Sequence, residues 1–120
     1  VYYVGLFNGM DDVELFNKTG QGRDTNRHHY TPAEIATALE QPVTQAIIAL
    51  ARLRKLPVFE GQFSWTVLSS DSIRLQWVKG AEQISLEFKT TVDAPEFVIE
   101  VTDAGGTKKY SGVNELAAAK

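Results

Sequence analysis

The hydrophobic pattern of the chain changes from helical to strand-like at Pro57, and this change constrains the fold more than any other feature. Before Pro57, apolar residues recur every three or four positions, as on the buried face of a helix. After it, they alternate with polar residues, as in strands with one buried face. A chain of 120 residues is long enough to bury a core in one domain. We therefore expect helices and then a sheet within a single domain.

Two helices are predicted before Pro57, with a tight turn between them. Thr31 can cap the first, Pro32 suits its first position, and Glu34 completes a capping box. Pro42 prevents this helix from continuing and suits the first turn of the next one. The sequence thus predicts helices over 31–39 and 42–55.

The segments after Pro57 predict an antiparallel meander. Residues 58–59 and 63–67 flank Glu60-Gly61-Gln62, which indicates a short hairpin. Further strands are expected where apolar and polar residues alternate, at 73–77, 84–88 and 97–101. Residues 107–110 follow a turn and can pair as a last strand. A short helix is expected over 113–119.

The N-terminal residues give weaker signals. Residues 2–7 are aromatic and β-prone. Residues 11–17 can form about two helical turns with Val13 and Phe16 inward. Residues 18–29 are polar and contain glycine, which indicates a surface loop. The predicted fold class is α+β, with one domain over 1–120 made of a helical half (about 11–56) and a β-rich half (about 57–110). One continuous core is expected to contain Ile35, Leu39, Val43, Ile47, Leu50, Phe63, Trp65, Leu75, Trp77, Leu86, Phe88, Phe97 and Ile99.

The order of elements over 31–68 resembles a winged helix-turn-helix at superfamily level. TPAEIATAL matches the first helix of the pair, IIALARLRKLPV matches the helix that leads into a wing, and FEGQFSWTV matches the wing. The resemblance implies a winged-helix-like helical half and a small nucleic-acid-binding or regulatory protein, whose partner would be duplex nucleic acid.

Charge gives candidate contacts for such a function. The net charge is −3, but basic residues concentrate between Lys18 and Lys55. In a complex with nucleic acid, phosphate contacts would come from Arg23, Arg27, Arg52 and Lys55, and the residues nearest the bases would be Thr44 and Gln45. The alternative is a protein-binding adaptor or inhibitor that uses the same helices or the sheet edge, and the net acidity favours it.

No arrangement of residues indicates an enzyme. Asp24, His28 and His29 could suggest a metal site, but adjacent histidines in an extended chain point to opposite faces, so a solvated loop is expected. The acidic residues over 11–14 are explained by favourable charge at a helix start. The sequence predicts no catalytic residue, no metal and no cofactor.

Composition indicates a soluble, intracellular protein. No apolar run approaches the roughly 20 residues that span a bilayer, so no membrane partner is expected. The segment VYYVGLFNGMDD lacks the basic region and cleavage site of a signal peptide. The absence of cysteine fits a reducing compartment, and a cytoplasmic location is predicted.

Overall fold

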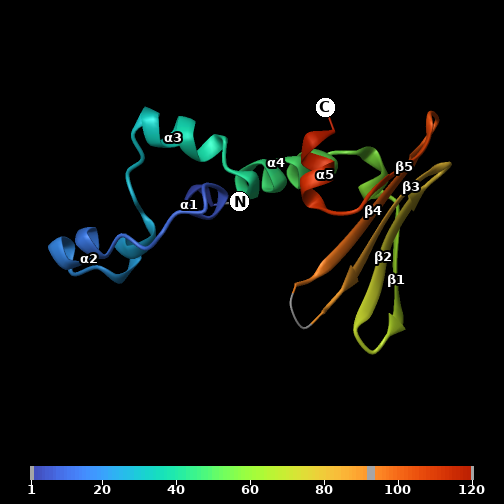
Figure 1. The fold of residues 1–120 in the computed structure, drawn as a ribbon, viewed down its shortest axis with the longest axis horizontal. Helices are drawn as coiled ribbons and strands as arrows, with labels where there is room; N and C mark the ends of the chain where they lie inside the picture. Colours follow the sequence, from blue (N-terminus) through green and yellow to red (C-terminus); the bar gives the residue numbers. More distant parts are fainter. Residues whose placement is uncertain (1, 92–93, 120) are drawn as a thin grey trace. The chain divides into compact units, whose positions relative to one another are not determined.

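The structure, a computed structural model, describes residues 2–91 and 94–119 and divides into two compact units, Val1–Ile48 and Ala49–Lys120. The first unit holds α1 (Tyr3–Leu6), α2 (Val13–Thr19), the 3₁₀ helix η1 (Gly22–Asn26), α3 (Pro32–Leu39) and the start of α4 (Pro42–Leu53). The second holds the end of α4, the 3₁₀ helix η2 (Pro57–Glu60), a five-stranded sheet and α5 (Val113–Ala118) (Figure 1). That all 120 residues form a single domain stays a prediction.

The sheet of the second unit is an antiparallel meander. Its strands lie in the order β1 (Gln62–Ser69), β2 (Ser72–Lys79), β3 (Glu82–Lys89), β4 (Glu96–Asp103) and β5 (Gly106–Tyr110), so each strand pairs with its neighbour in sequence. Alternation of apolar and polar residues predicted these strands because side chains in a strand point to opposite faces in turn.

The strand register places most of the apolar strand residues on one face of this sheet. Directly opposed residues of antiparallel strands share a face, so each set of partners forms a row across the sheet. The rows on this face are Phe63–Trp77–Ile84–Val101, which ends in Lys108 on β5, and the fully apolar or aromatic rows Trp65–Leu75–Leu86–Ile99–Tyr110 and Val67–Ile73–Phe88–Phe97. We call this surface the apolar sheet face.

The core of the second unit lies where η2 and α5 meet the apolar sheet face. Contacts of η2 are with β2 and β3, and those of α5 are with β4 and β5. Ile84 and Ile99 are almost fully buried there, together with Val58 from η2 and Leu116 from α5. The core therefore covers the middle of the apolar sheet face and leaves its β1 side exposed.

The entry into the sheet is fixed by close packing at Gly61. A Cβ at this position would collide with the backbone carbonyl of Val78, so only glycine lets the chain pass there. Beside it, the rings of Phe59 and Trp77 lie 4.9 Å apart, and the guanidinium of Arg54 lies 4.7 Å from the centre of the Phe59 ring. These contacts hold η2 against β2.

The winged-helix-like half predicted from the sequence is wrong. Residues 58–59 form no strand, because Pro57 begins a 3₁₀ turn that closes when the Gly61 N–H donates to the Val58 carbonyl at 3.0 Å. The first strand instead begins at Gln62 and pairs with β2 around Ser70-Asp71. The hairpin assigned as a wing therefore does not exist.

Two further expectations are corrected. Residues 2–7 contain helix α1 and no strand, and Val13 and Phe16 of α2 are exposed. The predicted core also fails in part, because several of its members are exposed: Leu39, Val43, Leu50, Phe63 and Trp65. The capping box of Thr31 and Glu34 is present as predicted at the start of α3.

In the part of the chain that the structure describes, no helix is both long and apolar enough to cross a bilayer.

Burial predicts where the sheet is most sensitive to mutation. Ile99 is 1% exposed, so Ile99→Ala should lower the free energy of unfolding by about 2–5 kcal/mol, since it leaves a cavity in a packed region. The exposed Thr66 on the opposite face is the control, because surface changes usually stay within about 0.5 kcal/mol. Denaturant unfolding measures both, and equal effects of Ile99→Ala and Thr66→Ala would contradict this placement of the core.

Candidate functional site

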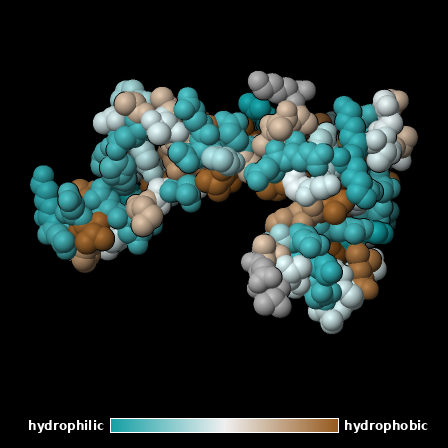
Figure 2. All heavy atoms as spheres, viewed as in Figure 1, coloured by the Kyte–Doolittle hydropathy of each residue, from teal (hydrophilic) through white to brown (hydrophobic). Residues whose placement is uncertain are grey.

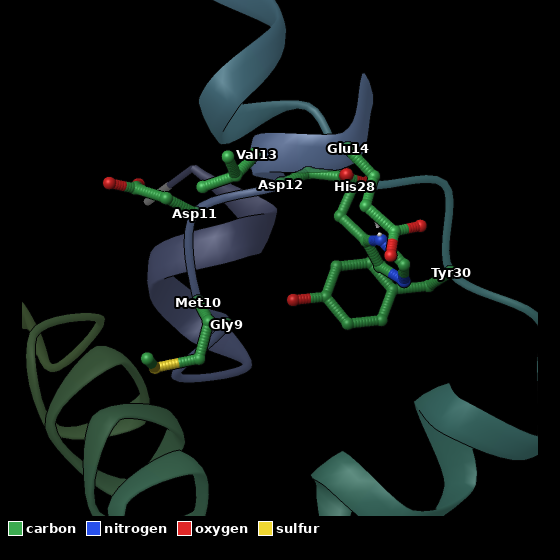
Figure 3. A pocket seen from close by; sticks show the side chains of 8 residues that line it. All are labelled: Gly9, Met10, Asp11, Asp12, Val13, Glu14, His28 and Tyr30. Atoms are coloured by element: carbon green, nitrogen blue, oxygen red, sulfur yellow. Dashed lines mark hydrogen bonds and ion pairs between the residues drawn. The ribbon is translucent and has the colours of Figure 1, made fainter. Parts of the chain in front are cut away.

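The most distinctive polar site lies in the first unit, around an open pocket of about 480 Å³. The residues that line it come from the α1–α2 connection, the start of α2 and the segment before α3: Gly9, Met10, Asp11, Asp12, Val13, Glu14, His28 and Tyr30 (Figure 3). Three carboxylates, an imidazole and a phenol thus share one concave surface. This composition is suited to hydrogen bonding with a polar ligand.

His28 connects two carboxylates at this site. Its Nδ1 lies 3.0 Å from Oδ2 of Asp12 and its Nε2 lies 3.2 Å from Oε1 of Glu34, both within hydrogen-bond distance. An ionised carboxylate only accepts hydrogen bonds, so the protonated form of the ring, the imidazolium, can donate to both carboxylates at once. We call this group the His28 clamp.

Each carboxylate of the clamp also caps a helix. The second oxygen of Asp12 accepts from the Leu15 N–H at 2.8 Å at the start of α2. The second oxygen of Glu34 accepts from the Thr31 N–H at 2.7 Å and the Thr31 hydroxyl at 2.8 Å at the start of α3. Because one oxygen caps and the other holds His28, the clamp ties the beginnings of two helices together.

Hydrogen bonding in the clamp shifts three pKa values. The pKa of His28 is raised above its ordinary value of 6.5, chiefly by the hydrogen bond that the ring donates to Asp12 and then by the one that it donates to Glu34. The pKa of Asp12 is lowered, first by its hydrogen bond with His28 and then by the Leu15 N–H. The pKa of Glu34 is lowered by the hydrogen bonds of Thr31 and, after them, by that of His28. All three charged forms are favoured together.

An aromatic cluster supports the imidazole ring. The ring of Tyr30 meets His28 edge-on with centroids 4.7 Å apart, and it also meets Phe7 at 5.1 Å and Tyr3 at 6.0 Å. Such edge-to-face pairs favour a fixed orientation of the rings. Tyr30 therefore connects the clamp to the aromatic residues of the N-terminal segment.

The clamp is suited to positioning more than to proton transfer. Both nitrogens of His28 are occupied, so the ring has no free lone pair to accept a proton while the clamp is intact. The remaining carboxylates at the pocket, Asp11 and Glu14, are exposed and can accept hydrogen bonds from a ligand. Within residues 2–91 and 94–119, no group of three or more His, Cys, Asp or Glu side chains could hold a metal ion.

The residues predicted to contact nucleic acid are spread over both units. Arg23 lies in η1, 4.0 Å from the carboxylate of Asp24, and Arg27 follows η1 as an exposed residue. Arg52 and Lys55 are exposed in the second unit, at the end of α4 and just after it. The structure does not bring these four residues together within one unit.

The two residues predicted to lie nearest the bases differ in exposure. Thr44 is fully buried, and its hydroxyl has no hydrogen-bond partner among the described residues, so it is not available to read a base edge. Gln45 is exposed, and its side-chain amide donates to the Leu39 carbonyl at the end of α3. The outward face assigned to α4 is thus wrong at Thr44.

Sequence reasoning missed the clamp although it assigned two of its members to helix starts. The sequence predicts that Asp12 provides favourable charge at the start of a helix and that Glu34 completes a capping box, and both residues do lie at helix starts. It predicts only a solvated loop at His28. The available signal was a histidine between two consecutive capping carboxylates, each of which has one oxygen left to accept a hydrogen bond.

The chain is similar to sucrose phosphorylases. It is 46% identical over 90 residues to sucrose phosphorylase of Bifidobacterium adolescentis, a match that covers 74% of this chain and 18% of the relative. It is 39% identical over 99 residues to sucrose 6(F)-phosphate phosphorylase of Thermoanaerobacterium thermosaccharolyticum, covering 78% of this chain and 20% of the relative. It is 37% identical over 95 residues to glucosylglycerol phosphorylase of Marinobacter adhaerens, covering 75% and 20%.

A solved structure shares the fold. The crystal structure of sucrose 6F-phosphate phosphorylase from Thermoanaerobacter thermosaccharolyticum superposes with a TM-score of 0.84 at 34% identity, covering 93% of this chain and 23% of that chain. No family model matches the sequence. The chain spans about a fifth of the length of the curated relatives it matches.

These similarities correct the functional predictions. The similar proteins are phosphorylases, so the predicted nucleic-acid-binding regulator, its adaptor alternative and the duplex nucleic-acid partner are wrong. The resemblance to a winged helix-turn-helix is wrong for the same reason. The prediction that the protein is not an enzyme is contradicted too, because the proteins that it resembles are phosphorylases.

The shifted pKa values predict how the clamp responds to pH. The folded-state pKa of His28 is raised, so its stabilising contribution is fully present below pH 6.5 and is lost as pH rises through the folded value. The pKa values of Asp12 and Glu34 are lowered from 3.8 and 4.5, so their contributions are present above those values and are lost as pH falls further. The clamp is therefore most stabilising in mildly acidic solution, between these limits.

NMR titration of the His28 ring tests this. We expect a pKa above 6.5 that falls in Asp12→Asn, because the largest cause of the shift is removed. Glu14→Gln is the matched control, since it removes a carboxylate of the same pocket that is not one of the two hydrogen-bond partners of His28. An equal decrease in both variants would show that general charge, and not the clamp, sets the pKa.

Proposed function

We propose that this chain is part of a longer glycoside phosphorylase that transfers a glucosyl residue from sucrose, a phosphorylated sucrose or glucosylglycerol to inorganic phosphate. The observation that carries the proposal is the TM-score of 0.84 at 34% identity with a sucrose 6F-phosphate phosphorylase over 93% of this chain. The identities of 37–46% with three curated phosphorylases support it, because each match covers about three quarters of the chain.

The reaction places demands that this chain meets only in part. Phosphorolysis breaks the bond between the sugar C1 and the leaving oxygen, which takes a proton, and forms a bond between C1 and a phosphate oxygen. Enzymes that cleave glycosidic bonds commonly use a pair of carboxyl groups for such steps. Asp12 and Glu34 are both occupied by His28 and by helix caps, so they do not suit this task. We propose that the catalytic carboxylates lie in the part of the enzyme outside these 120 residues.

In this proposal the pocket beside the His28 clamp adds polar contacts to the sugar site. Sugar hydroxyls donate hydrogen bonds, and the exposed carboxylate of Glu14 can accept them. The clamp and Tyr30 would hold the wall of the pocket in place. The role is therefore binding and positioning.

A cytoplasmic location is proposed with this function. It is supported by the absence of cysteine from the sequence, which fits a reducing compartment.

The natural polypeptide that contains this sequence should release glucose 1-phosphate from one of the three glucosides. The assay compares sucrose, sucrose 6F-phosphate and glucosylglycerol, each with and without inorganic phosphate. Release that requires phosphate is the expected result. Turnover of none of them, or hydrolysis at the same rate without phosphate, would overturn the proposal.

Glu14→Gln in that polypeptide should raise the KM for the sugar, because a neutral amide accepts hydrogen bonds from hydroxyls less strongly than a carboxylate does. The control is Glu82→Gln, which removes the same charge from an exposed position on β3. If both variants keep the wild-type KM, the pocket does not contact the sugar.

A further inference from the structure

The apolar sheet face is only partly covered within the second unit. Its members on β1 are the most exposed, with Phe63 at 50%, Trp65 at 62% and Val67 at 61%. The row Val67–Ile73–Phe88–Phe97 contains no buried residue, although all four of its side chains are apolar. Figure 2 shows hydrophobic side chains at the surface in the region of the sheet.

The opposite face of the same sheet carries mostly polar and charged side chains. Arg74 pairs with Glu87 across β2 and β3, and Lys109 pairs with Glu100 at 3.0 Å across β5 and β4. These ion pairs and the polar residues between them are typical of a solvated sheet face. The contrast shows that the exposed apolar residues belong to a face whose pattern is that of a core.

Such a face is costly to leave in water. A contiguous apolar patch with aromatic residues on a soluble protein usually marks a surface that another folded element covers. The patch also reaches β1, which is an edge strand of the sheet. A free sugar is a poor occupant of the row Val67–Ile73–Phe88–Phe97, because this partly exposed row carries no hydrogen-bonding side chain to orient hydroxyls.

We infer that the apolar sheet face is the surface on which the remainder of the longer enzyme packs. The inference rests on the proposed function, because it requires such a longer polypeptide. About four fifths of each similar phosphorylase lies outside the region that matches this chain. The same fold also occurs as 23% of a larger solved chain, so it exists attached to a much larger body.

Covalent attachment favours this occupant over a second copy of the chain. A segment in the same polypeptide is held near the face at a high effective concentration, whereas a second copy must pay the full entropy of association. The complementary surface on the enzyme should therefore be apolar and should cover the β1 side of the face and the row that ends at Phe97.

Carbene footprinting of the natural polypeptide tests the inference by comparing the two faces of the sheet. Val67 lies on the apolar sheet face and is 61% exposed, whereas Val78 of β2 lies on the other face, opposite Gln62 and Gln83, and is 36% exposed. If the remainder of the enzyme covers the apolar sheet face, labelling of Phe63, Trp65 and Val67 should fall severalfold below labelling of Val78. Labelling of Val67 above that of Val78 would overturn the inference.

A pair of variants gives the second arm. Trp65→Glu should lower the unfolding midpoint and raise labelling of Val67, because a charge cannot be buried without a partner. Thr66→Glu places the same charge on the adjacent residue of the opposite face and should change neither value. Equal behaviour of the two variants would contradict a buried apolar sheet face.

Two controls separate the possible failures. Protection that disappears on dilution would assign the face to a second copy and overturn the inference. The phosphorolysis assay is run on the same preparation: activity together with an unprotected Trp65 rejects this inference alone, whereas protection without activity supports the packing and rejects the proposed reaction.

Discussion

The two-residue alternation of the strands, which is interrupted in β1 between Val67 and Ser69, is the constraint on which the second unit depends. The five strands pair in sequential order, and the two residues of each opposed pair point to the same face of the sheet. The order of apolar and polar residues in each strand therefore decides which face is apolar. A shift of one residue in any pair would move its apolar side chains to the solvated face. The Arg74–Glu87 and Glu100–Lys109 pairs oppose the same shift, because it would separate their charges. The register is thus held from both faces.

The first unit is held by a different kind of interaction. Its helices are short, and a helix of fewer than about 12 residues has little stability of its own. The His28 clamp compensates by joining the N-terminal caps of α2 and α3 through one imidazolium. Because each cap already orients its carboxylate, the ring meets two acceptors that are held in place. Local capping and a contact between segments distant in sequence therefore reinforce each other.

Elements with a strong local cause could be predicted from the sequence. Alternation located β2, β3 and β4 to within two residues at each end, and the capping box located the start of α3. The strands predicted at 2–7 and 58–59 were wrong, because a short apolar run has the same composition in a strand and in a single helical turn. The apolar rows were recognised as core-forming, but burial depends on what covers them, and alternation within a strand carries no information about that.

The candidate site was harder to predict than the fold, and the reason is physical. The basic residues between 18 and 55 look like a patch when they are counted along the chain, yet the four predicted phosphate contacts are shared between two separate units. His28 looked solvated because its partners lie 16 residues before it and 6 residues after it. Charge density in sequence is a poor guide to charge density in space, whereas a carboxylate that caps a helix has a defined position and one oxygen still free. The sequence specifies the two helix starts, and the second oxygen of each capping carboxylate is the atom that bonds to His28.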